Sequence, residues 1–140
     1  LIDGPDLAEQ IAEATGNAPI MLALDPVGGD TYGRLAKSLG YSGTLVSYGF
    51  LSGKPPMLNV GQLIYNDTRL RGFWLYKWYQ TATMQEKQEA FGQVIPLIVK
   101  GTLKANIDSR YSVDEIKQAV TRAWEGERNG KVLIVPSSLE

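Results

Sequence analysis

Short apolar runs alternate with helical segments in the first half of this 140-residue chain, and this alternation most constrains its fold. Residues 19–24 read PIMLAL and residues 43–49 read GTLVSYG, and each run has the length of a strand. A continuous apolar run such as PIMLAL is typical of a strand buried on both faces of a parallel sheet. Apolar residues at helical spacing predict helices over 5–15 and 30–39. The alternation therefore predicts a doubly wound α/β sheet.

A further strand is predicted over 68–75, after a short helical turn at 62–66. The second half of the chain has a different rhythm. Its predicted elements are a long amphipathic helix, an extended segment, a second helix and a final strand, at 84–100, 106–112, 112–126 and 130–136. Pro96 predicts a kink or a late start in the long helix. Ser112 with Glu115 three residues on predicts a capping box, and Gly126 is the expected end of that helix.

The first residues suggest that the chain is the C-terminal piece of a longer protein. The sequence opens LIDGPDLAEQ without a Met. Leu1 and Ile2, followed by Asp3 and Gly4, look like the end of a strand that runs into a turn. A natural domain rarely begins inside a strand, so we expect sequence before position 1.

Composition excludes several classes of function. Hydrophobic residues make up 44% of the chain, enough for a core, and the net charge is only -1. This near balance argues against a nucleic-acid or anionic-membrane surface. The chain has no Cys and no His, which removes disulfides, thiolate chemistry, Ser-His-Asp triads and most zinc sites from it. No apolar run has the length of a membrane span and no signal peptide opens the chain, so a cytoplasmic setting is expected.

A candidate ligand site lies where the predicted strands end. Ligands of open α/β sheets bind beyond the carboxyl ends of the strands. The segments at these ends read LDPVGGD, SYGFLSGKPP and FWLYKW. Gly28, Gly29 and Gly49 would let the backbone approach a ligand closely, although the same glycines equally fit simple turns. The sequence contains no G-x-G-x-x-G and no Walker A motif, so no phosphate-cradling loop is predicted in this chain.

The chain resembles, over nearly its whole length, the medium-chain dehydrogenase/reductases. The resemblance rests on LALDPVGGDTYGRLAKSLGYSGTLVSYGFLSGKPP and LIYNDTRLRGFWLYKW, and most specifically on RGFWL at the expected distance after VSYG. It is strongest to the zinc-independent branch of 2-enoyl thioester reductases and quinone oxidoreductases. It implies the second half of a Rossmann-type doubly wound sheet in 1–80. In 81–140 it implies a return segment of the catalytic, GroES-like domain.

The resemblance also implies a cofactor, NADP(H) or NAD(H), and the residues that contact it. These residues are Tyr48, Gly49, Phe50, Leu51, Phe73, Trp74, Leu75, Tyr76 and Lys131. The loop from Asp25 to Gly29 is similar to the loop beside the nicotinamide, where relatives often have Asn-Cys instead of Asp25-Pro26. Relatives usually have a second Gly where Phe50 stands. Phe73 and Leu75 equally suit a hydrophobic core, and Trp78 suits packing.

The function implied by the resemblance is hydride transfer between a nicotinamide and an enone, enoyl thioester, quinone or alcohol/carbonyl substrate. No catalytic residue and no metal ligand is assigned within this chain. In the family, the phosphate loop and the catalytic groups would precede position 1, so the fragment alone is predicted to be inactive. Two alternatives stay open: a zinc-dependent alcohol dehydrogenase parent, and a non-catalytic association module on the same half-fold. The family pattern further implies a homodimer that pairs through the edge strand 68–75.

Overall fold

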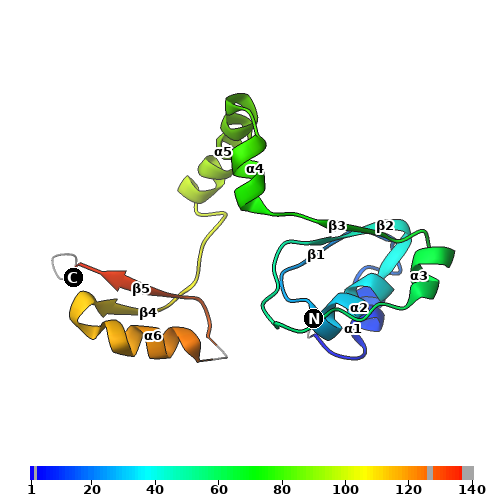
Figure 1. Ribbon diagram of the computed structural model, residues 1–140, viewed down its shortest axis with the longest axis horizontal. Helices are drawn as coiled ribbons and strands as arrows, with labels where there is room; N and C mark the ends of the chain where they lie inside the picture. The colour runs from blue at the N-terminus through cyan, green and yellow to red at the C-terminus, as the bar shows by residue number, and fades with distance from the viewer. Residues whose placement is uncertain (2, 126–127, 137–140) are drawn as a thin grey trace. The chain divides into compact units, whose positions relative to one another are not determined.

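A computed structural model describes residues 1, 3–125 and 128–136 of the chain (Figure 1). The described residues form two compact units, Leu1–Ala82 and Thr83–Glu140. The assignment of 1–80 and 81–140 to two domains of a parent protein stays a prediction. The predictions made for Ile2 and Gly126 lie outside the described residues.

The first unit is built around a parallel sheet of three strands in the order β1-β2-β3. This confirms the predicted α/β class with a parallel sheet. Its strands are β1 (Ile20–Asp25), β2 (Leu39–Ser47) and β3 (Arg69–Gly72). Its helices are α1 (Leu7–Ala14), α2 (Gly29–Lys37), α3 (Val60–Tyr65) and α4 (Leu75–Thr81). The last paired rows join Asp25 to Ser47 and Ser47 to Gly72, so all three strands end at one edge of the sheet.

The core of this unit lies between the sheet and α2. Tyr32 and Ala36 of α2 pack against buried side chains of the strands. Helix α1 packs against α2 on the same side of the sheet (Figure 1). The buried cluster consists of Ala23, Tyr32, Ala36, Leu39 and Leu45. Leu45, in the central strand, has no exposed surface. Burial of the apolar side chains of α2 against Leu45 therefore stabilises the packing of this helix on the sheet.

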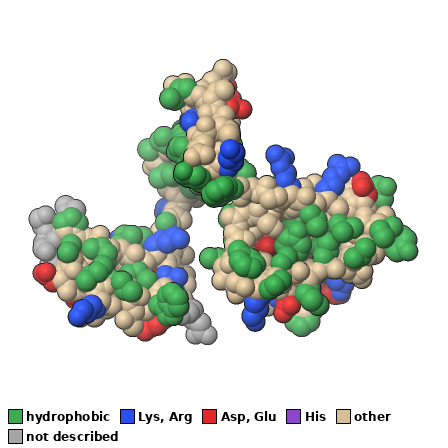
Figure 2. Space-filling model, viewed as in Figure 1, with side chains coloured by type: hydrophobic (Ala, Val, Ile, Leu, Met, Phe, Trp, Pro, Cys, Tyr) green, Lys and Arg blue, Asp and Glu red, His purple; other side chains and the backbone are tan. Residues whose placement is uncertain are grey.

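The other face of the sheet is exposed within the chain, and the prediction that residues 19–24 are buried on both faces is wrong. Leu22 and Leu24 are each 57% exposed, whereas Ala23 and Asp25 are buried. Side chains alternate between the two faces of a strand, and α2, the described helix with the most contact to these strands, packs on the face that carries Ala23. Large hydrophobic side chains accordingly remain on the surface (Figure 2).

Strand β3 is shorter than predicted. It ends at Gly72 instead of residue 75, and α4 begins at Leu75. The backbone N–H of Phe73 donates one more hydrogen bond to the carbonyl of Ser47 at 2.8 Å. Strand β2 ends at Ser47, so the chain after Phe73 has no neighbouring strand with which to pair. The predicted strand residues Trp74 and Leu75 instead lead into a helix.

The second unit pairs β4 (Ile107–Ser112) with β5 (Lys131–Val135) in parallel. A 3₁₀ turn, η1 (Val113–Glu115), and helix α6 (Ile116–Trp124) connect the two strands and pack against them. The predicted capping box is confirmed, because the Ser112 side chain accepts from the backbone N–H of Glu115 and the Ser112 backbone N–H donates to the Glu115 carboxylate at 2.8 Å. Helix α5 (Met84–Val99) starts where predicted and runs through Pro96, so the alternative of a late start is wrong.

An ion pair joins β4 to α6 in this unit. The Arg122 guanidinium donates to both carboxylate oxygens of Asp108, at 2.8 and 2.6 Å. Ser109 and the backbone N–H of Asn129 donate to the same carboxylate at 3.0 and 3.2 Å. The Asp108 side chain is only 9% exposed. Arg122, followed by these donors, lowers the pKa of Asp108 from 3.8 to about 2.

Acid is expected to weaken the second unit in a defined pH window. The pKa of Asp108 is lower in the folded chain than in the unfolded chain, so its ionised form stabilises the fold above the ordinary pKa of 3.8. That contribution is lost as the pH falls from about 3.8 to about 2. The measurement is amide hydrogen exchange of β4 and β5 across this range. Arg122→Gln should weaken the unit at neutral pH and flatten the acid step, and an unchanged step in that variant would contradict the assignment to Asp108.

Candidate functional site

The loop that follows β1 is organised by a buried carboxylate. Asp25 is fully buried at the end of the strand. Its Oδ1 accepts hydrogen bonds from the backbone N–H groups of Val27 and Gly28 at 2.9 and 3.0 Å, and its Oδ2 accepts from Gly28 at 3.1 Å. A carboxylate is an acceptor only, so these donors suit it. Asp25 thereby turns the chain sharply away from the sheet.

The loop after β2 is held against the loop after β1. The N–H of Leu51 donates to the carbonyl of Pro26 at 3.1 Å, and the N–H of Ser52 donates to that of Val27 at 2.9 Å. Gly28 has φ +75°, a conformation that side chains rarely adopt, and a Cβ there would lie 3.1 Å from the Phe50 ring. The glycine thus makes the turn possible and leaves room for the second loop.

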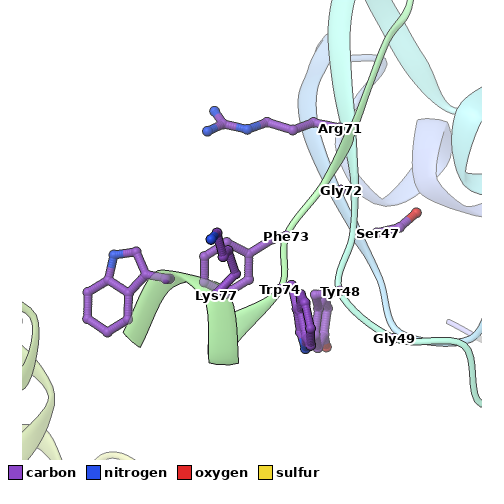
Figure 3. A pocket seen from close by; sticks show the side chains of 9 residues that line it. Ser47, Tyr48, Gly49, Arg71, Gly72, Phe73, Trp74 and Lys77 are labelled. Atoms are coloured by element: carbon purple, nitrogen blue, oxygen red, sulfur yellow. The ribbon is translucent and has the colours of Figure 1, made fainter. Parts of the chain in front are cut away.

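A cavity of about 570 Å³ opens at the ends of β2 and β3 (Figure 3). Its wall is formed by the last residues of both strands, the first turn of α4 and the residues between them. The lining residues are Ser47, Tyr48, Gly49, Arg71, Gly72, Phe73, Trp74, Lys77 and Trp78. The walls are therefore largely aromatic, with two cationic side chains and a backbone stretch at Gly72. This is the edge at which open α/β sheets bind their ligands.

Four of the residues predicted to contact a cofactor lie together in this cavity, namely Tyr48, Gly49, Phe73 and Trp74. Phe50 and Leu51 lie in the neighbouring loop, with 56% and 81% of their surfaces exposed.

The remaining predicted residues are outside the cavity. Leu75 is the first residue of α4, and the Tyr76 ring lies 5.3 Å from that of Trp74, measured between ring centroids. Lys131 begins β5 in the second unit, where its N–H donates to the Asn106 carbonyl. The cofactor roles of all nine residues stay predictions.

Arg71 and Lys77 are lining residues that the sequence reasoning did not select. Lys77 lies on α4 beside Trp78, and the four-residue spacing of Trp74 and Trp78 is the signal that would have predicted a helix there. The sequence predicted a strand up to residue 75 and no helix over 75–81, so this signal was missed. Figure 3 shows the Arg71 and Lys77 side chains extending to the same side of β3, away from Ser47.

Within the described part of the chain, every helix is too short or too polar to span a membrane. No group of three or more acidic, His or Cys side chains there is arranged to hold a metal ion.

A parallel sheet with a ligand cavity at its carboxyl edge is the arrangement of the nucleotide-binding α/β proteins. A family model described as zinc-binding dehydrogenase matches residues 3–134. The chain therefore belongs to this family, within the medium-chain dehydrogenase/reductases, in the enoyl reductase and quinone oxidoreductase branch. The resemblance seen in the sequence is confirmed.

Similar proteins and structures agree with this placement. The mitochondrial enoyl-[acyl-carrier-protein] reductase of Dictyostelium discoideum is 34% identical over 113 residues, which are 81% of this chain and 32% of that protein. The Bos taurus enzyme of the same name is 38% identical over 60% of this chain and 22% of its own length. A crystal structure of a putative NADPH:quinone reductase from Bacillus thuringiensis matches with a TM-score of 0.73 and 28% identity, over 90% of this chain and 38% of that one. The chain thus spans about a third or less of the two curated relatives.

Proposed function

We propose that this chain forms the nicotinamide side of the active site in an NADPH-dependent reductase of enoyl thioesters or quinones. The observation that carries the proposal is the cavity at the ends of β2 and β3, lined by Tyr48, Gly49, Phe73 and Trp74. The names of the Dictyostelium and Bacillus relatives support the two substrate classes and the cofactor. NADH remains the alternative cofactor.

The residues of the cavity fit a flat, partly polar ring. Aromatic side chains from Tyr48 and Trp74 provide stacking surfaces for such a ring. A Cβ placed at Gly72 would meet no atom of the described chain within 4 Å, so the backbone there is open to a ligand. When bound, the cofactor supplies the hydride. The chain would bind and orient the ring and keep water from its face, while the acid or base comes from residues outside this chain.

The proposal is tested by binding, with Gly72→Ala as the probe. A methyl group at position 72 has open space in the chain, so folding should be unchanged. The same methyl would enter the ligand's space, and we expect it to weaken NADPH binding about tenfold, equivalent to ~1.4 kcal/mol. The measurement is a fluorescence titration with NADPH and with NADH. It is made on the longest polypeptide that contains this chain, both as the wild type and as Gly72→Ala.

The controls separate the possible results. The 140 residues alone should bind poorly and show no turnover of crotonyl thioester or quinone. Equal NADPH affinity of the wild type and of Gly72→Ala would contradict the placement of the cofactor in this cavity. Absence of saturable binding by the longest polypeptide would favour a non-catalytic association module instead.

We also propose that the parent protein dimerises through β3. Within the described residues β3 pairs only with β2, which leaves one side of its backbone for another strand. Leu70, on this strand, is 42% exposed. Unpaired strand edges favour pairing with a second copy. Sedimentation of the longest polypeptide as a monomer at high concentration would contradict the pairing.

A further inference from the structure

The two cations of the cavity have no acidic partner among the described residues, in contrast to three other arginines of the chain. Arg34, Arg69 and Arg122 each pair with a carboxylate. Arg71 and Lys77 make no side-chain hydrogen bond or ion pair that the described residues show, and the cavity wall contains no Asp or Glu. Both side chains are largely exposed.

The comparison is sharpest between Arg69 and Arg71, because both belong to β3 and are two residues apart. Side chains at this spacing leave a strand on the same face. Arg69 lies 3.2 Å from the Asp67 carboxylate, whereas Arg71 extends toward the cavity on the side that Lys77 also occupies (Figure 3). Two like charges that line one cavity repel each other, and a bound anion relieves that repulsion.

The aromatic walls limit what kind of anion fits. Phe73 and Trp78 line the cavity together with the two cations. A ligand that satisfies both features has an uncharged part that packs on the rings and a phosphate within reach of the cations. A quinone has no such anion. The phosphopantetheine arm that carries an enoyl thioester has an amide and thioester end with a phosphate beyond it.

We propose that Arg71 and Lys77 form an anion subsite for the phosphate of the substrate's carrier arm, and so favour carrier-bound enoyl thioesters over quinones. The inference rests on the proposed function, whose substrate class it narrows. Arg71 offers a planar fork that donates to two phosphate oxygens, and Lys77 contributes a point charge. Both residues act on substrate binding and take no part in the hydride transfer.

The test uses the longest polypeptide that carries this chain and two thioesters, crotonyl-4′-phosphopantetheine and crotonyl-pantetheine. The two have the same reacting group and arm and differ only in the phosphate. We expect the double variant Arg71→Gln/Lys77→Gln to raise KM for crotonyl-4′-phosphopantetheine about tenfold and to leave KM for crotonyl-pantetheine and kcat for both unchanged. Added salt should reproduce part of the effect in the wild type.

Arg69→Gln is the matched control, because it removes the same charge from the same strand outside the cavity. It should leave the ratio of the two KM values unchanged. An equal effect of Arg69→Gln would mean that only the general surface charge matters and would overturn the subsite. A loss of NADPH affinity in the double variant, with the thioester ratio unchanged, would assign the cations to the cofactor's phosphates and also overturn it.

Calorimetric titration with 4′-phosphopantetheine and with pantetheine separates this proposal from the proposed function. Preference for 4′-phosphopantetheine that disappears in the double variant supports the subsite even where no thioester is reduced. Reduction of both thioesters with equal KM in the wild type would preserve the reductase and overturn the subsite.

Discussion

Replacing Asp25 by Ala is expected to lower the free energy of unfolding of the first unit by about 3 kcal/mol. The substitution leaves the N–H groups of Val27 and Gly28 without the carboxylate that now accepts from them. Hydrogen bonds to a charged acceptor contribute roughly 1.5–3 kcal/mol each, and buried donors without a partner add a desolvation cost. Asp25→Asn should cost less, about 1–2 kcal/mol, because a carboxamide keeps one acceptor oxygen and turns an NH₂ group toward Gly28.

The measurement is urea unfolding followed by the fluorescence of Trp74 and Trp78, in a Trp124→Phe background that silences the second unit. Asp30→Ala is the matched control, because Asp30 is exposed and lies in the first turn of α2, five residues after Asp25. It should change the unfolding free energy by less than about 0.5 kcal/mol. Similar losses for Asp25→Ala and Asp30→Ala would show that the buried carboxylate does not hold the loop.

The second large effect is expected for Gly49→Ala, which should lower the free energy of unfolding by about 2–3 kcal/mol and distort the cavity. A Cβ at position 49 would lie 2.5 Å from the carbonyl oxygen of Pro26 and 3.1 Å from its Cα. These atoms are backbone, so the two loops must move apart. Their separation would strain the hydrogen bond from Leu51 to the same Pro26 carbonyl. Overpacking of this kind typically costs about 1–3 kcal/mol before hydrogen bonds are lost.

Gly72→Ala is the natural comparison for this variant in the same unfolding experiment. Both glycines line the cavity, but only Gly49 meets backbone at the position of the added methyl. Gly72→Ala should leave stability unchanged or raise it slightly, since Ala restricts the unfolded chain more than Gly does. If the two variants unfolded at the same urea concentration, the close approach of Gly49 to Pro26 would not contribute to the stability of the fold.

These two predictions share one cause, which is the loop-on-loop packing at the carboxyl edge of the sheet. Asp25 sets the course of the first loop, and Gly49 lets the second loop lie against it. The second loop carries Tyr48 into the cavity wall. A change at Asp25 should therefore weaken ligand binding, even though Asp25 does not line the cavity.

The sequence was informative where structure is local. Except for helix α4, which was not predicted, the order of helices and strands and the capping box at Ser112 were predicted, and the structure has them with bounds shifted by a few residues. Helical periodicity, caps and breakers act over a few neighbouring residues, so they can be read along the chain. The position of the candidate site was also predicted, because the carboxyl edge of a parallel sheet is set by strand direction.

The tertiary structure decided what depends on neighbours distant in sequence. Strand β3 stops at Gly72 because β2 stops at Ser47, and no pattern within residues 68–75 records where the partner strand ends. Leu22 and Leu24 are exposed because α2 covers the other face of the sheet. The apolar run that contains them equally fits a strand that is buried on both faces. Arg71 and Lys77 share a cavity only because the chain passes from strand to helix between them. By itself, then, the sequence determined most of the elements, their order and the family, whereas pairing and packing between distant segments determined which side chains meet.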